Sequence, residues 1–343
     1  MANKTETAAL PSGSKAIVLG MLFKVDVANP NAGWTEENVT PLKKIETPDN
    51  RRHPYISGQA LRRYLRDTLT DNIEVDENGS PPYAFSPEEP GPDPKSPILT
   101  AGRPDLYIDD DLLGFMRATR GGTRRRESPL RVSAGFGLFP YAGDRDLGTR
   151  SALRVTNKPE SGGAVFETEV TNNVFRTTWL LELNRVGWWH GYENNVSSDL
   201  AEIKGLDIEE RRRRVKALLR AIKYLNGGAR QARLMIELVP QLVIYARMTK
   251  KVPIFLNALH VEPMDGQYRL VNGPLEEVLK DYTADIEKLC IGLRGGFVTT
   301  KRSEIEELVK VALGQRLNVI NPEVKSVGEA VDVMVADVQT AQF

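Results

Sequence analysis

The sequence predicts a mixed α/β protein, and three observations support this. The stretches Ala16 to Val27 and 174–184 are apolar and β-branched, which is typical of strands buried on both faces. The segments 58–70 and 207–226 have apolar residues at the 3.6-residue period of helices. Two more strands are predicted at 130–140 and 238–248. The resulting order, βαββαβ, is that of a ferredoxin-like or RNA-recognition fold with large insertions.

Composition narrows the class of protein. A chain of 343 residues suits one large domain with insertions, or two domains. The 46 basic residues balance the 46 acidic ones, so only their distribution can indicate a nucleic-acid partner. The single cysteine, Cys290, excludes an intramolecular disulfide and a cysteine-built zinc site. The polar start and the absence of a membrane-length apolar run lead us to expect a cytoplasmic protein with no membrane partner.

The first predicted helix carries a basic face. Ser57 is a good N-cap residue, and the buried face would consist of Leu61, Tyr64, Leu65 and Leu69. The opposite face carries Gln59, Arg62, Arg63 and Arg66, and the loop before the helix adds Lys43, Lys44, Arg51 and Arg52. Guanidinium groups in one stripe suit a polyphosphate backbone, whereas the alternative interpretation is a solvated helix face.

An acidic, proline-rich segment follows the first helix. Residues 71–111 contain seven prolines between 81 and 97, so we expect an irregular insertion over the surface. Asp109, Asp110 and Asp111 precede a short apolar run. Adjacent carboxylates in this position are more typical of a helix N-terminus than of a metal site.

Two further basic segments contain paired glycines. Gly121-Gly122 lies among Arg117, Arg120, Arg124, Arg125, Arg126 and Arg131. Gly227-Gly228 ends the second long helix, and Arg230, Gln231 and Arg233 follow. Glycine pairs let the backbone approach a ligand closely, whereas a mobile surface loop is the alternative interpretation.

The remaining elements are a hairpin and a C-terminal region. Weak two-residue periodicity in 142–172 predicts a protruding β-hairpin that carries Arg150, Arg154 and Lys158. A strand is expected at Ile254 to Val261, and helices are expected at 274–290 and 303–315. The tail from Asn321 is strand or coil.

The sequence lacks the motifs of common catalytic sites. Its three histidines are far apart, and it contains no nucleophile elbow, P-loop, dinucleotide fingerprint or zinc-protease motif. We therefore expect no catalytic residue, no metal and no cofactor. The basic segments indicate a module that binds the backbone of a single nucleic-acid strand.

Several short segments resemble a known family. They are Asn29-Pro30 followed by Ser57-Gly58-Gln59-Ala60-Leu61-Arg62, Leu113-Gly114-Phe115-Met116, Ser128-Pro129-Leu130-Arg131-Val132-Ser133, Phe166-Glu167-Thr168-Glu169-Val170 ahead of Phe175, and Asn226-Gly227-Gly228-Ala229-Arg230-Gln231-Ala232 with Pro240 downstream. Together they resemble the DevR-like branch of the CRISPR-associated protein seven family, within the RAMP superfamily. This family supplies the multi-copy backbone subunit of type I (Cascade) effector complexes, and the resemblance is greatest to type I-B.

The resemblance implies a right-hand shape. Residues 1–70, 128–141 and 173–343 would form an RRM-like palm with C-terminal helices, 71–127 the fingers insertion and 142–172 the thumb hairpin. Residues expected to hold RNA are Gln59, Arg62, Arg63, Arg66, Arg51, Arg52, Arg124, Arg125, Arg126, Ser128, Arg131, Gly227, Gly228, Arg230 and Gln231. Arg150, Arg154 and Lys158 would belong to the thumb. Deletion of 145–170 is expected to spare folding, since a protruding hairpin buries little surface.

The implied partners are the CRISPR RNA (crRNA), its target DNA, and neighbouring copies stacked head to tail in an open helix. Others are the handle-capping subunit, the large subunit and the repeat endonuclease. The acidic fingers of one copy would face the basic surface of the next. The alternatives are a metal-dependent ribonuclease of the RAMP superfamily, with Asp49 in the corresponding loop, and a DNA-binding autoregulator. The absence of a helix-turn-helix pattern counts against the autoregulator.

Overall fold

A central, mainly antiparallel sheet organises the protein. The computed structural model describes residues 13–72, 83–91, 98–119, 122–150, 164–189 and 205–341. The main sheet has the strand order β16-β15-β12-β1-β11-β8-β4-β3, and β7 also pairs with β11. Its middle is formed by β1 (Ala16–Ala28), β11 (Thr171–Glu182), β12 (Leu242–Met248), β7 (Leu130–Val132) and β8 (Gly135–Gly137). These strands, with α1 (Gly58–Asp71) and α4 (Ile208–Ala221), give the βαββαβ order and confirm the predicted mixed α/β fold.

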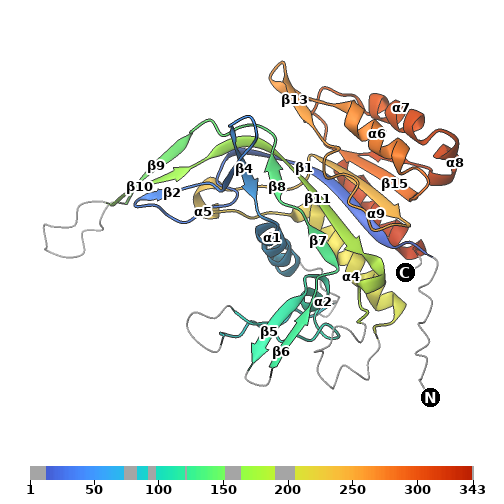
Figure 1. The fold of residues 1–343 in the computed structure, drawn as a ribbon, viewed down its shortest axis with the longest axis horizontal. Helices are drawn as coiled ribbons and strands as arrows, with labels where there is room; N and C mark the ends of the chain where they lie inside the picture. Colours follow the sequence, from blue (N-terminus) through green and yellow to red (C-terminus); the bar gives the residue numbers. More distant parts are fainter. Residues whose placement is uncertain are drawn as a thin grey trace, which may run out of the picture.

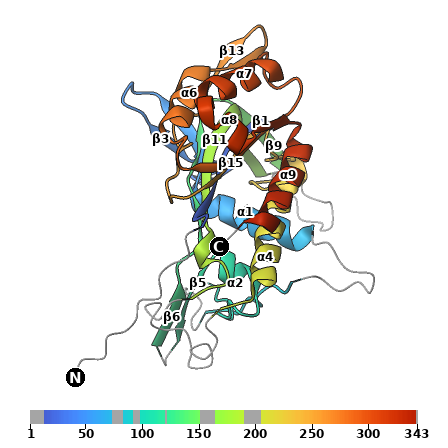
Figure 2. The ribbon, with the colours of Figure 1, turned by 90° about the vertical axis from the view of Figure 1, so that its right-hand side faces the viewer.

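Both faces of the sheet are covered (Figures 1 and 2). On one face, α1, α4 and α9 (Val327–Thr340) pack on alternate residues of β1, including Ile17, Leu19 and Met21. On the other face, residues 254–259 with α6 (Asn272–Asp281) and α7 (Arg302–Leu313) pack on Ala16, Val18 and Leu22. The two apolar faces explain why β1 is a nearly continuous hydrophobic run.

The two predicted helix starts are confirmed. The Ser57 hydroxyl accepts a hydrogen bond from the Ala60 amide at 3.3 Å, and the Asp207 carboxylate accepts one from the Glu210 amide at 2.9 Å. Both caps satisfy amides that the first helical turn leaves without a carbonyl partner. Short 3₁₀ turns at 183–185, 222–224 and 314–316 end or join longer elements.

Two insertions extend from the sheet in different directions (Figure 1). The first contains α2 (Ile108–Leu112) and a hairpin of β5 (Phe115–Thr119) and β6 (Gly122–Arg126), at the bottom of the view. The second is the predicted hairpin, β9 (Arg145–Arg150) and β10 (Ala164–Glu169), which forms a three-stranded sheet with β2 (Val39–Thr40). A further hairpin, β3 (Lys44–Glu46) and β4 (Arg52–Ile56), leads into α1.

The C-terminal third differs most from the sequence prediction. The strand predicted at Ile254 to Val261 is wrong, because residues 254–258 form turns and the next strands are β13 (Val261–Met264) and β14 (Gln267–Leu270). The helix predicted to reach 290 ends at Asp281, and residues 286–290 belong to β15 (Ile286–Leu293). The segment Ile286–Leu293 becomes a strand because it pairs with β12 and packs on both faces. The helix predicted at 303–315 is confirmed as α7.

The tail is mainly helical, so the expectation of strand or coil from Asn321 is wrong for most of it. After α8 (Leu317–Ile320) and the short β16 (Glu323–Lys325), a capping box of Ser326 and Glu329 starts α9. This is the recognised sequence signature of a helix start, and it precedes the apolar residues that pack on the sheet. Among the described residues, no helix is both long and apolar enough to cross a membrane.

Candidate nucleic-acid interface

The glycine-rich loop of the third basic segment packs against α1. Gly227, with φ 149°, lies against the ring of Tyr64, and a Cβ at this glycine would overlap that ring. The Tyr64 hydroxyl in turn donates to the Pro30 carbonyl at 2.9 Å. The Asn226 amide lies 3.4 Å from the Thr68 hydroxyl, one helical turn further on. The glycine-rich loop is therefore fixed against the helix that carries the first basic face.

The end of β1 joins the loop to the base of the β9–β10 hairpin. The Ala229 amide donates to the Asn29 carbonyl at 2.9 Å, and the buried Asn29 side chain donates to the Glu169 carbonyl at 3.0 Å. The Asn31 side chain accepts a bond from the Ser57 amide at 2.9 Å, at the start of α1. Four segments that are far apart in sequence thus meet at one end of the central strand.

Arg230 and Gln231 follow the paired glycines. Arg230 adopts a left-handed conformation with φ 60°, and its exposed side chain lies 3.3 Å from the Thr40 hydroxyl. The Gln231 side chain bonds the Ile236 amide at 2.9 Å and its carbonyl at 3.4 Å. Gln231 therefore closes the turn around α5 (Gln231–Leu234), whereas the Arg230 side chain is exposed beside the loop.

Arg233 is a residue that the sequence interpretation omitted from the site. Its guanidinium bonds the Thr168 hydroxyl at 2.8 Å, pairs with Asp146 at 3.4 Å and lies over the Phe166 ring at 4.8 Å. These contacts connect α5 to the β9–β10 hairpin. The position of Arg233 immediately after the glycine-rich segment was the available signal.

The basic face of α1 is only partly open to solvent. Gln59 is exposed, and the Arg63 side chain is 55% exposed with Asp67 at 2.9 Å. Arg62 bonds the Leu113 carbonyl, and burial lowers the pKa of its guanidinium. Arg66 is 17% exposed and pairs with Asp109 at 2.9 Å and with Glu88. The acidic insertion therefore contacts the basic helix of its own chain.

The second basic segment is divided by the fold. Arg124 and the exposed Arg125 lie on β6, and Arg124 bonds the Ala101 carbonyl at 3.4 Å. The Arg126 side chain is buried and pairs with Asp111 at 2.5 Å. The buried Ser128 hydroxyl lies 2.8 and 2.6 Å from the carbonyls of Leu112 and Leu130. The structure corrects the prediction for these two residues, because Arg126 and Ser128 bond the protein interior and have little surface for RNA.

The remaining predicted residues lie at other places on the surface. Arg131 on β7 has a 60% exposed side chain, with Glu182 at 2.6 Å. Arg51 and Arg52, 66% and 69% exposed, are on the β3–β4 hairpin near Asp49 and Glu46. Arg150 is the last residue of β9, while Arg154 and Lys158 lie outside the described residues.

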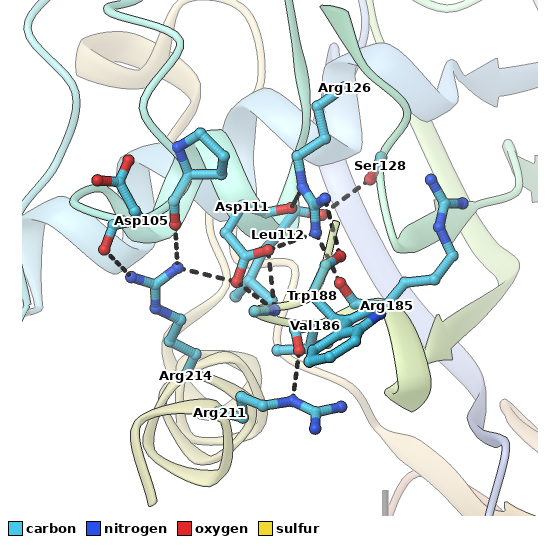
Figure 3. A network of polar contacts seen from close by, with 12 residues as sticks. Asp105, Asp111, Leu112, Arg126, Ser128, Arg185, Val186, Trp188, Arg211 and Arg214 are labelled. Atoms are coloured by element: carbon cyan, nitrogen blue, oxygen red, sulfur yellow. Dashed lines mark hydrogen bonds and ion pairs between the residues drawn. The ribbon is translucent and has the colours of Figure 1, made fainter. Parts of the chain in front are cut away.

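Buried carboxylates connect the first insertion to α4 and to residues that follow β11 (Figure 3). Asp111, fully buried, pairs with Arg126 at 2.5 Å and Arg214 at 2.9 Å, and it accepts a bond from the Gly187 amide at 2.9 Å. Arg214 also donates to the Pro104 carbonyl at 2.6 Å. The aspartates at 109–111 do open α2, as expected, but the carboxylate of Asp111 holds three segments together instead of capping the helix.

The described residues contain no group of three or more His, Cys, Asp or Glu side chains that could hold a metal ion. Asp49, the residue considered for a ribonuclease, is exposed in a turn with the Thr47 hydroxyl 2.5 Å from its carboxylate. That hydrogen bond lowers the pKa of Asp49.

Known proteins resemble this chain in sequence and in fold. The family model described as "CRISPR-associated negative auto-regulator DevR/Csa2" matches residues 98–262. A relative from Myxococcus xanthus (strain DK1622), described as "CRISPR-associated protein Cas7/Cst2/DevR", is 30% identical over 128 residues. That match covers 33% of this chain and only 39% of the relative's length.

Two solved structures share the fold. A chain of a "CRISPR RNA-guided surveillance complex" has a TM-score of 0.56 at 15% identity, covering 94% of this chain and 99% of that one. A chain of a "CRISPR RNA-guided surveillance complex, pre-nicking" has a TM-score of 0.54 at 11% identity, covering 94% of this chain and all of that one. The family model and the Myxococcus xanthus relative confirm the resemblance to the DevR-like branch of the CRISPR-associated protein seven family, and the two structures confirm the fold.

Proposed function

We propose, from the resemblance of this chain to the DevR-like CRISPR-associated protein seven family, that it is the multi-copy backbone subunit of a type I effector complex. In this role it binds the crRNA backbone, polymerises along the RNA and presents it for pairing with target DNA. One observation supports this most directly. Tyr64 of α1, the glycine-rich loop and the base of the β9–β10 hairpin meet at one end of β1.

The chemistry of this surface suits a sugar-phosphate backbone. Gln59, Arg63 and Arg230 are exposed, and Gly227 packs against Tyr64 of α1. Cations and backbone amides contact phosphates without reading the bases. A subunit that binds a guide of any sequence needs this kind of recognition, since base pairing supplies the specificity.

Replacing Arg63 and Arg230 together by alanine is expected to weaken binding of single-stranded RNA by about 10- to 100-fold at moderate salt. The slope of log Kd against log salt should fall by about 1.4, because each phosphate contact on a single strand contributes ~0.7. Fluorescence anisotropy with labelled RNAs of several sequences would measure both quantities.

Lys310→Ala is the matched control, because Lys310 is an exposed cation on α7, outside the proposed interface. An equal loss of affinity for Lys310→Ala would contradict the proposal. A change confined to one base sequence would contradict it as well, since phosphate contacts act on all sequences alike.

The β9–β10 hairpin corresponds to the proposed thumb, and its base is more integrated than we expected. The Glu169 carboxylate is buried, accepts a bond from the Leu42 amide at 2.7 Å and pairs with Lys44. Deletion of 145–170 would remove this residue and leave those donors without an acceptor. We therefore expect that deletion to destabilise the protein by about 2–4 kcal/mol, in contrast to the expectation from sequence.

A shorter deletion, of 147–167, keeps Glu169 and is expected to preserve stability within about 1 kcal/mol. If the hairpin acts as a thumb that interrupts the bound RNA strand, this shorter deletion should instead change how target DNA pairs with that RNA. Thermal unfolding of both deletion proteins, with a target-capture assay of assembled complexes, provides the measurement. Equal loss of stability in the two deletion proteins would rule out the distinction between a base of the hairpin that stabilises the fold and an outer part that does not.

The description of the matching family model contains the words "negative auto-regulator", so we keep a DNA-binding autoregulator as the second candidate function. The two functions differ in ligand. Competition between labelled single-stranded RNA and the duplex of the protein's own promoter decides between them, and preference for the duplex would favour the autoregulator.

A further inference from the structure

We infer that Glu88 is an internal competitor of RNA phosphate on α1. Its carboxylate occupies the anion position between Arg63 and Arg66 that a phosphodiester would take in the bound subunit. This inference rests on the proposed function, and it adds a residue of the acidic insertion that determines how strongly and how selectively the helix binds.

The geometry defines one anion position. The Arg63 Nη1 atom lies 3.0 Å from Oε1 of Glu88, and the Arg66 Nη1 atom bonds the same oxygen. Two guanidinium groups, one helical turn apart, therefore converge on a single carboxylate oxygen. A phosphodiester oxygen has the charge and acceptor geometry to replace it.

Other carboxylates keep the two guanidiniums in place. The Nε atom of Arg63 bonds Asp67 at 3.1 Å, and that of Arg66 bonds Asp109 at 2.9 Å. Arg66 also donates to the Ser86 carbonyl at 3.1 Å. Both arginines are thus oriented without Glu88, so an incoming phosphate has only to displace one carboxylate.

The segment that carries Glu88 is anchored independently of this side chain. The Ser86 amide bonds Asp109 at 2.9 Å, and the Ser86 hydroxyl accepts a bond from the Ala101 amide at 2.7 Å. Glu89 and Leu99 exchange two backbone hydrogen bonds of 2.8 Å. Glu88 itself is 35% exposed, so its replacement should leave the fold intact and the position open.

The physical consequence is a binding threshold. A short or weakly charged ligand gains too little binding free energy to displace Glu88. A long strand that is bound by several neighbouring copies gains enough binding free energy from its other contacts. The competitor therefore favours assembly on a continuous RNA over capture of short fragments. This adds an intramolecular role to the acidic insertion, which we expected to face the basic surface of the next copy.

The test compares Glu88→Gln with Glu89→Gln in the full chain, with a fluorescein-labelled 30-nucleotide single-stranded RNA of mixed sequence as the probe. Glu89 is the adjacent residue, and its partner is Arg117 at 2.7 Å, so both variants remove one negative charge. Glu88→Gln is expected to tighten binding about three- to tenfold and to steepen the salt dependence by ~0.7, while Glu89→Gln changes Kd less than about twofold.

In a background of Arg63→Ala and Arg66→Ala, Glu88→Gln should no longer tighten binding, because the position it frees has lost both cations. Equal affinities for Glu88→Gln and Glu89→Gln would overturn the inference, as would an undiminished gain in that background. If the RNA binds the wild type, and loss of Arg63 and Arg230 weakens it, such a result leaves the proposed function standing. Absence of any RNA binding by the wild type would overturn both.

Discussion

Asp111→Asn is expected to destabilise the protein by about 3–5 kcal/mol, since it removes one partner of a buried ion network. The carboxylate is fully buried and pairs with the buried guanidiniums of Arg126 and Arg214, and Arg214 also pairs with Glu210 at 2.8 Å. Asparagine keeps the volume but has no charge, so two cations remain in an environment where desolvation is costly. The loss should loosen the first insertion from α4, whose Arg214 bonds the Pro104 carbonyl, and from residues 185–188, which Arg126 contacts.

Urea unfolding monitored by tryptophan fluorescence measures this effect. Glu307→Gln is a suitable control, because Glu307 is 70% exposed and pairs with Lys310 at 3.7 Å. We expect that control to change stability by less than about 0.5 kcal/mol. An unfolding midpoint for Asp111→Asn equal to that of the wild type would show that the network does not hold the insertion.

Gly227→Ala is expected to weaken RNA binding by at least about tenfold and to cost about 2–4 kcal/mol of stability, from combined overlap and backbone strain. The glycine has φ 149°, a conformation that favours glycine, and an added Cβ would enter the ring of Tyr64. The loop would have to move away from α1. This movement would separate Arg230 from Arg63, so the two could no longer contact one backbone track.

Gly273→Ala controls for the loss of a glycine as such, because no heavy atom lies within 4 Å of a Cβ at that position. Anisotropy with the same RNA and urea unfolding would be measured on both variants. Wild-type affinity for Gly227→Ala would mean that the contact between the loop and α1 does not form part of the RNA site.

The sequence predicted the central strands and the helices α1 and α4 well for a local reason. The hydrophobic period of β1 and of α1 is set by residues within a few positions of one another, and so are the caps at Ser57 and Asp207. The same analysis missed α9 and the boundary between α6 and β15. The segment Ile286–Leu293 is a strand because β12 lies beside it, and no local pattern reports that neighbour.

The candidate site likewise has features that the sequence predicts and features that depend on the tertiary fold. The sequence alone determined which residue types were present: glycine pairs next to arginines, a basic helix face and a hairpin between two strands. Only the tertiary structure decided which cations face solvent. Arg126 and Arg66 are far in sequence from Asp111 and Asp109, and chain folding brings each pair together.

The physical reason is that the charge of a side chain is fixed by its residue type. Whether that charge is available to a ligand depends on how far the side chain lies from every opposite charge in the folded protein. Arg214 and Asp111 are separated by 103 positions, yet they lie 2.9 Å apart in a buried network. Local spacing reveals a helix face, but it does not reveal a partner that arrives from another part of the chain. The surface that remains for RNA is therefore set by which arginines the fold itself has already neutralised.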